Sequence, residues 1–130
     1  MPDSIASLVR RLENGDLDPA AFRHDDHVRV AWALLQHHDF FEALARLRVG
    51  LKSLASRAGR PGAYHETITL AYLLLIHDRI VTRGRGATWD DFAAANPDLL
   101  VWPSPVLSRY YSQDLLESDL ARRHFRWPEH

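Results

Sequence analysis

The feature that most constrains this chain is a run from His65 to Arg83, which reads HETITLAYLLLIHDRIVTR. Between Ile68 and Ile76 the run is apolar almost all the way round a helix, which is the pattern of a buried helix. Its β-branched residues would also suit a strand, but the run is far longer than a strand usually is. The sequence therefore predicts a central, buried helix over residues 65–83.

Other segments show the same helical period, and helix-starting and helix-ending residues mark their ends. Ser4 can cap the first helix, and Asn14-Gly15 can end it. Asn96-Pro97 can stop a short helix that starts at Thr88 or Asp90. We expect an all-α, single-domain helical bundle of about five helices over residues 1–130. The expected helices are about 5–13, 26–38, 40–57, 65–83 and 112–124, with a short one ending at Ala95.

The composition narrows the functional classes. The chain has 130 residues, 46% of them hydrophobic and 25% charged, with a net charge of −1 and no cysteine. A charge this close to zero gives no field that would favour nucleic acid, and we expect no nucleic-acid partner. Without cysteine, a metal ion must be held by histidine and carboxylate. No apolar run is long enough to span a membrane and the start does not look like a signal peptide, so we expect a cytoplasmic protein.

Two histidines stand at the expected start of the 26–38 helix, in the stretch FRHDDHVRVAWALL. His24 and His27 are three residues apart, which on a helix places their side chains on one face about 5–6 Å apart. A helix N-terminus disfavours a protonated imidazole, and neutral imidazole is the form that binds a metal ion. Two imidazoles placed in this way can share one metal ion.

Chain direction adds two more groups to this end of the expected bundle. Short connections make neighbouring helices antiparallel, so the helix that begins with His65 and Glu66 should start at the same end as the helix that carries His24 and His27. Three histidine ligands would leave a coordination position open, as a catalytic metal requires. We predict His24, His27 and His65 as ligands of a divalent transition metal, namely Zn, Fe, Mn or Ni. Glu66 is the predicted general base or a further ligand.

The same residues have a structural interpretation. Asp25 or Asp26 can be the N-cap of the 26–38 helix, and His65 can bond to a backbone carbonyl at the start of its own helix. Glu66 can be a favourable charge in the first helical turn. The chain would then be a non-catalytic helical module that binds a ligand or a protein partner. The sequence leaves both interpretations open.

A second polar cluster is expected at the opposite end, formed by His37, His38, Asp39, His77 and Asp78, and we interpret it as a solvated rim. The dipeptides His38-Asp39 and His77-Asp78 also resemble the His-Asp pair of HD-domain phosphohydrolases, which are helical. In those enzymes a His, an adjacent His-Asp pair and a distant Asp hold the metals. An activity of this type is the third hypothesis.

Read together, FRHDDHVRVAWALL, ALARLRVGLKSLA and YHETITLAYLLLI resemble a family of small bacterial proteins of uncharacterised function. Its members carry an F-x-H-x-x-H-[VL] element followed by a Y-H-x-T helix. The resemblance covers about residues 22–82 and continues more weakly through 110–122. It implies that His24, His27 and His65 belong together, and it implies no reaction. We expect an unknown small molecule as substrate if the protein is an enzyme, and apolar faces on several helices are compatible with a homo-oligomer.

Overall fold

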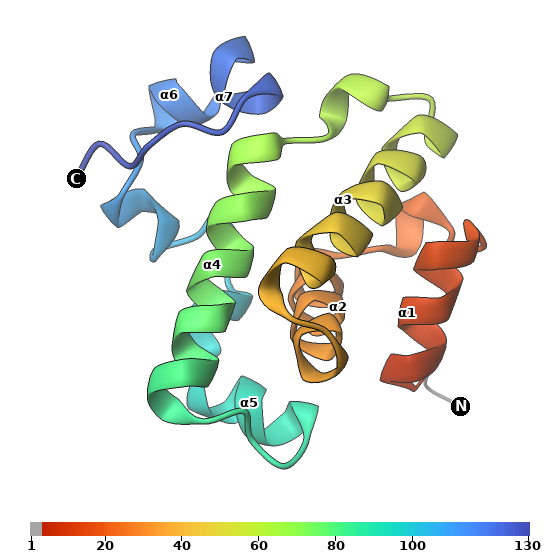
Figure 1. The fold of residues 1–130 in the computed structure, drawn as a ribbon. Helices are drawn as coiled ribbons and strands as arrows, with labels where there is room; N and C mark the ends of the chain where they lie inside the picture. The colour runs from red at the N-terminus through yellow and green to blue at the C-terminus, as the bar shows by residue number, and fades with distance from the viewer. Residues whose placement is uncertain (1–3) are drawn as a thin grey trace. The chain divides into compact units, whose positions relative to one another are not determined.

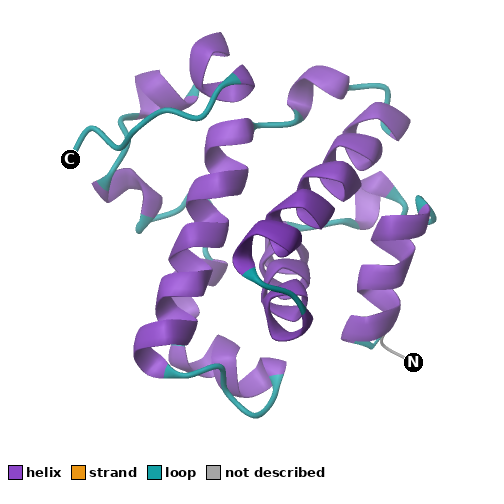
Figure 2. Ribbon diagram, in the orientation of Figure 1, coloured by secondary structure: helices purple, strands orange, loops and turns teal. Residues whose placement is uncertain are grey.

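The computed structural model describes residues 4–130, and this part of the chain is built from helices without any strand, as Figure 1 and Figure 2 show. The all-α class predicted from the sequence is confirmed. The helices are α1 (Ile5–Asn14), α2 (His24–His37), α3 (Phe40–Arg57), α4 (Glu66–Arg83), α5 (Trp89–Ala95), α6 (Gln113–Leu116) and α7 (Asp119–Arg123).

Short 3-10 turns stand between the helices, and three of them begin with a proline. Proline suits the first position of such a turn because its φ is already set and its missing N–H needs no partner there. The turns are Pro19–Ala21, Pro61–Ala63, Pro97–Leu100 and Leu107–Arg109.

The chain divides into two compact units, one ending at Tyr64 and one running from His65 to His130. The expectation of one domain over residues 1–130 stays a prediction. Among residues 4–130, none of the helices combines the length and the apolar character needed to cross a membrane.

In the first unit, α1, α2 and α3 pack against one another. α2 is the most buried of the three, since every residue from Val30 to Leu35 is buried. Gly50 of α3 lies so close to α1 that a Cβ atom at this position would stand 2.7 Å from Cγ of Leu12. An ion pair between Arg46 Nη1 and Glu13 Oε2, 3.6 Å apart, joins the same two helices.

Two predicted helix ends in the first unit are confirmed, both of them in α1. The Ser4 hydroxyl accepts the Ser7 N–H at 3.1 Å, and Gly15 ends α1 with a φ of 76°. This left-handed conformation is one that glycine adopts without strain. Asp39, which the sequence had not marked as a cap, accepts the Glu42 N–H at 2.8 Å and lets α3 begin with only two residues between it and the end of α2.

The start of α2 differs from the prediction. The helix begins at His24 instead of residue 26, and Arg23 occupies the N-cap position, so the prediction of Asp25 or Asp26 as the N-cap was wrong. Asp26 still satisfies the helix start, because its carboxylate reaches back and accepts the Arg23 N–H at 3.0 Å. An acidic residue in the third helical position commonly does this. As a result, both His24 and His27 lie within the first turn.

Within the second unit, residues 65–130, α4 is the one long helix, and α7 packs against it. Tyr72, Leu73 and Ile76 are buried, as predicted. The helix is not buried all the way round, because Leu74 is 43% and Val81 is 67% exposed. The remaining helices of this unit are short, so most of its C-terminal half is irregular.

The predicted helix over 112–124 is in fact two short helices, α6 and α7. Ser112 caps α6 as predicted, accepting the Leu115 N–H at 3.1 Å. Ser118 then breaks the helix: its hydroxyl accepts the Ala121 N–H at 3.1 Å and donates to the Leu115 carbonyl at 2.6 Å. Serine competes with the helical backbone in this way, which is why it favours helix starts over helix interiors.

Candidate functional site

The first turn of α2 carries two of the predicted metal ligands, His24 and His27. Both residues lie within the helix, so their i, i+3 spacing places them on the same helical face, as the prediction required. The ring of His27 also contacts the ring of Phe22, with centroids 4.5 Å apart. Within residues 4–130 the ring nitrogens of His27 show no hydrogen bond. The structure thus brings these two histidines together on one helical turn.

The electrostatics of this turn keep His27 neutral. The pKa of its imidazole is lowered to about 4, first because the surrounding protein disfavours the charged ring and then because His24 is nearby, while Asp26 opposes the shift. A neutral imidazole at pH 7 is a competent metal ligand.

The third predicted ligand, His65, has both ring nitrogens engaged in hydrogen bonds. It is the N-cap residue of α4, and its Nδ1 accepts the Ile68 N–H at 3.1 Å. Its Nε2 lies 2.6 Å from the carbonyl oxygen of Leu116. Because a carbonyl can only accept, Nε2 must carry the proton, and the ring is the neutral tautomer with both nitrogens used. A metal ion could bind His65 only by displacing one of these two partners.

The pKa of His65 is also lowered. Burial is the largest cause, the Leu116 carbonyl opposes it, and the positive charge of Arg122 adds to the lowering. The neutral form that the two hydrogen bonds require is therefore also the form that the environment favours.

The predicted general base, Glu66, is half-buried in the first turn of α4. A carboxylate at this position is favoured by the partial positive charge of a helix N-terminus. This accounts for the acidic side chain without a catalytic role, and the role of general base stays a prediction.

Three further polar side chains of α4 hold the irregular half of the second unit, and sequence reasoning gave them no role. The Thr67 hydroxyl is fully buried and lies 2.6 Å from the Ala121 carbonyl oxygen. The Tyr72 hydroxyl lies 3.1 Å from the carbonyl oxygen of Leu99. Arg79 makes a two-pronged ion pair with Asp98, with N–O distances of 3.0 and 2.8 Å, and also donates to Asn96 at 3.0 Å.

A spacing in the sequence could have indicated part of this network. His65, Tyr72 and Arg79 follow one another at intervals of seven residues, so they share one face of α4. Hydrogen-bonding side chains repeated on the buried face of an apolar helix indicate polar partners elsewhere in the fold. No comparable pattern marks Thr67, whose partners lie 54 to 59 residues further along the chain.

Among residues 4–130, no group of three or more histidine, aspartate or glutamate side chains is arranged so that it could hold a metal ion. The ligand set of His24, His27 and His65 therefore stays a prediction. His24 and His27 belong to the first unit, whereas His65 and Glu66 belong to the second.

The second polar cluster also contains residues with structural roles. Asp39 is the N-cap of α3, His37 ends α2 and His38 is its C-cap. His77 and Asp78 lie on α4, where the backbone carbonyl of Asp78 accepts the Thr82 hydroxyl at 2.8 Å. The capping role of Asp39 explains the His38-Asp39 dipeptide without an HD-type metal site.

Together these observations define an all-α protein with a pair of histidines at one helix start and a polar, structural face on α4. Comparison with known proteins adds no relative: no family model fits the chain, and no curated protein or solved structure is significantly similar to it.

Proposed function

We propose that this chain is a non-catalytic helical module that binds a partner, and that His65 serves to hold the module together. The observation that carries the proposal is the pair of hydrogen bonds made by the two ring nitrogens of His65, to Ile68 N–H and to the Leu116 carbonyl. Both partners are backbone groups of the same unit. A histidine bound in this way organises the fold and has no lone pair left for a metal ion.

The surface of the second unit supports a binding role. Trp102 is 49% exposed, Tyr110 38% and Trp127 81%. Tryptophan and tyrosine are the residues most enriched among those that contribute strongly to protein interfaces. Large exposed aromatic side chains on a small protein are costly in solubility, so they favour a surface that is covered in a complex.

Two substitutions of His65 separate the structural role from metal binding. His65→Asn keeps an N-cap acceptor for Ile68 N–H but cannot reach Leu116, whereas His65→Ala loses both bonds. We expect stability to fall in the order wild type, His65→Asn, His65→Ala, with about 1–3 kcal/mol lost in His65→Ala. Urea unfolding measures this loss.

Metal analysis of the untagged protein completes the test. We expect substoichiometric metal in the wild type and in both variants, and a melting temperature that a chelator leaves unchanged. The proposal would be refuted if the wild type held one equivalent of metal and both His65→Asn and His65→Ala lost it equally. A metal ligand is lost in either variant, whereas a capping residue is partly replaced by asparagine.

A second candidate function, divalent transition-metal binding, is favoured by the first turn of α2. The observation is the placement of His24 and His27 on the same helical turn, and the lowered pKa of His27, which favours the neutral ring, is consistent with it. Titration with Zn²⁺ or Ni²⁺, followed through the histidine NMR signals, should then show saturable binding that His24→Ala and His27→Ala each abolish. His37→Ala, an exposed histidine at the other end of α2, is the matched control. Because binding only to the native state stabilises it, metal should also raise the melting temperature.

A further inference from the structure

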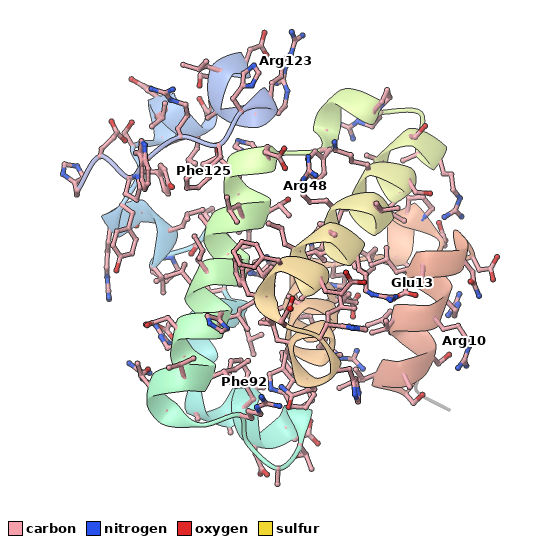
Figure 3. All side chains as sticks on the ribbon, in the orientation of Figure 1. Arg10, Glu13, Arg48, Phe92, Arg123 and Phe125 are labelled. Atoms are coloured by element: carbon pink, nitrogen blue, oxygen red, sulfur yellow. The ribbon has the colours of Figure 1, made fainter. Side chains whose placement is uncertain are left out.

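The C-terminal segment, residues 124–130, is extended and is held in place through its backbone. Figure 1 shows it, at the blue end of the chain, running beside α6 and α7. The Arg126 N–H donates to the Thr67 hydroxyl oxygen at 3.1 Å, and the Arg126 carbonyl accepts the Tyr111 hydroxyl at 2.8 Å. The side chains of Thr67, which accepts, and Tyr111, which donates, are both buried, Thr67 completely. Phe125 consequently lies beside the first turns of α4 (Figure 3).

Glu129, three residues after Arg126, makes a second set of contacts. Its N–H donates to the Tyr110 carbonyl at 2.7 Å. Its carboxylate accepts the Ser112 N–H and, at 3.3 Å, the Ser112 hydroxyl. The pKa of Glu129 is lowered, chiefly because the Ser112 N–H stabilises the charged form.

The residues between these two anchor points contribute little. Trp127 is 81% exposed and touches Phe125 in an edge-to-face contact, with ring centroids 6.0 Å apart. Pro128 is exposed and has no N–H to donate. The unit therefore recognises the segment by one residue's N–H and carbonyl and by a carboxylate three residues later. This is how proteins bind an extended peptide: the main chain gives affinity and a few side chains give selectivity.

We propose that Thr67, Tyr110, Tyr111 and Ser112 form a binding site, here called the tail site, for an extended peptide segment of a partner protein that carries one carboxylate side chain, and that residues 124–130 occupy this site in cis. The inference rests on the proposed function and specifies the partner's chemistry. The tail site accepts a segment that carries Glu or Asp three residues after a residue whose backbone N–H and carbonyl are free to bond. Proline is accepted just before the acidic residue, because no N–H is used there.

The segment is suited to being displaced. Its anchoring contacts are hydrogen bonds, and its largest side chain, Trp127, is 81% exposed, which is typical of segments that open locally. While it is attached, its effective concentration at the tail site is in the millimolar range. A partner segment therefore binds well only when the attached segment is weakened or when the partner binds more tightly.

The test uses the full-length chain with the attached segment disabled. In the double variant Arg126→Pro/Glu129→Ala, position 126 can no longer donate to Thr67 and the carboxylate is gone. Trp127→Ala is the matched control, since it changes the same segment without removing an anchor. The probe is a fluorescein-labelled peptide with the sequence HFRWPEH, and its binding is measured by fluorescence anisotropy.

We expect the double variant to bind the peptide saturably, and the wild type and Trp127→Ala to bind it at least about tenfold more weakly, because their own segment competes. A peptide with alanine in place of glutamate should bind the double variant about tenfold more weakly, as the loss of a charge-assisted hydrogen bond predicts. Adding Tyr111→Phe to the double variant should weaken binding severalfold.

Three results would overturn the proposal: a folded double variant that does not bind the peptide, equal binding by wild type and double variant, or binding that ignores both the glutamate and Tyr111→Phe. Hydrogen exchange of the wild type gives a check that needs no variant. The Arg126 and Glu129 amides should exchange at least 100-fold faster than that of Leu73 in α4, roughly the separation between local and global opening. Equal exchange would show a fixed segment and also overturn the proposal. None of these readouts depends on the metal content that tests the role of His65.

Discussion

Replacing Thr67 by valine tests whether the second unit is held by hydrogen bonds from α4. Valine has nearly the shape of threonine, so the packing around this fully buried position is preserved and only the hydroxyl is lost. The hydroxyl lies 2.6 Å from the Ala121 carbonyl oxygen and 2.9 Å from that of His124, and it accepts the Arg126 N–H at 3.1 Å. The variant leaves these backbone groups without this partner.

The size of the effect follows from burial. Ala121 is completely buried, so its carbonyl loses a hydrogen bond that water cannot replace, at a cost of about 1–3 kcal/mol. The groups of His124 and Arg126 lie in exposed residues and can turn partly to water, which adds about 1 kcal/mol. We expect a total loss of about 2–4 kcal/mol, equivalent to a fall in melting temperature of about 8–16 °C.

Urea unfolding followed by circular dichroism measures the loss, with Thr69→Val as the control. Thr69 is also buried in α4, and its hydroxyl makes no hydrogen bond within residues 4–130. Thr69→Val should therefore change stability by less than about 1 kcal/mol, since valine and threonine have similar helix propensities. If the two variants are equally stable, the Thr67 contacts do not hold the unit together and the reasoning is wrong.

Three other predictions concern pH, an ion pair and a close helix contact. The pKa of His27 is lower in the folded state than in the unfolded state, so protonation favours unfolding. The free energy of unfolding should therefore be highest above pH 6.5 and should fall as the pH is lowered towards 4. Urea unfolding should show a smaller fall over this pH range for His27→Gln, which cannot take up the proton, than for the wild type. Arg79→Lys keeps the charge but loses the two-pronged geometry with Asp98, and we expect a loss of about 1–2 kcal/mol in the same assay. Gly50→Ala should be destabilising by about 1–3 kcal/mol even though alanine favours helices, because the new Cβ would stand 2.7 Å from Cγ of the buried Leu12; a stabilised variant would show that α1 and α3 can separate at no cost.

The long helices could be predicted from the sequence because their signals are local. The period of apolar residues and the residues at each end lie within a few positions of one another. Asp39 and Gly59 bracket α3, whose predicted range of 40–57 matches the structure, and the predicted cap at Ser4 also matches. α2 begins two residues earlier than predicted, because the Asp26 carboxylate accepts the Arg23 N–H from inside the first turn. An acidic residue can occupy this third helical position as readily as the N-cap position, and the sequence does not distinguish the two.

The contacts that decide the interpretation of the candidate site are not local. His65 bonds to Leu116 across 51 residues, and Thr67 bonds to Arg126 across 59. No pattern of spacing reveals which distant carbonyl a histidine will meet. The sequence could therefore place His65 at a helix start, where the structure has it, but could not tell that its second nitrogen was already taken.

The two units are stabilised by different means, and this bears on the remaining histidines. In the first unit long helices bury apolar faces, so a change of side-chain volume such as Gly50→Ala should matter most. The second unit follows α4 with helices of only four to seven residues, which cannot persist by their own hydrogen bonds. Polar side chains of α4 supply what these short helices lack, and His65 is one of them. A metal site that includes His65 would have to break this system. The ring nitrogens of His27, by contrast, make no hydrogen bond within residues 4–130, so a metal titration is most informative at the first turn of α2.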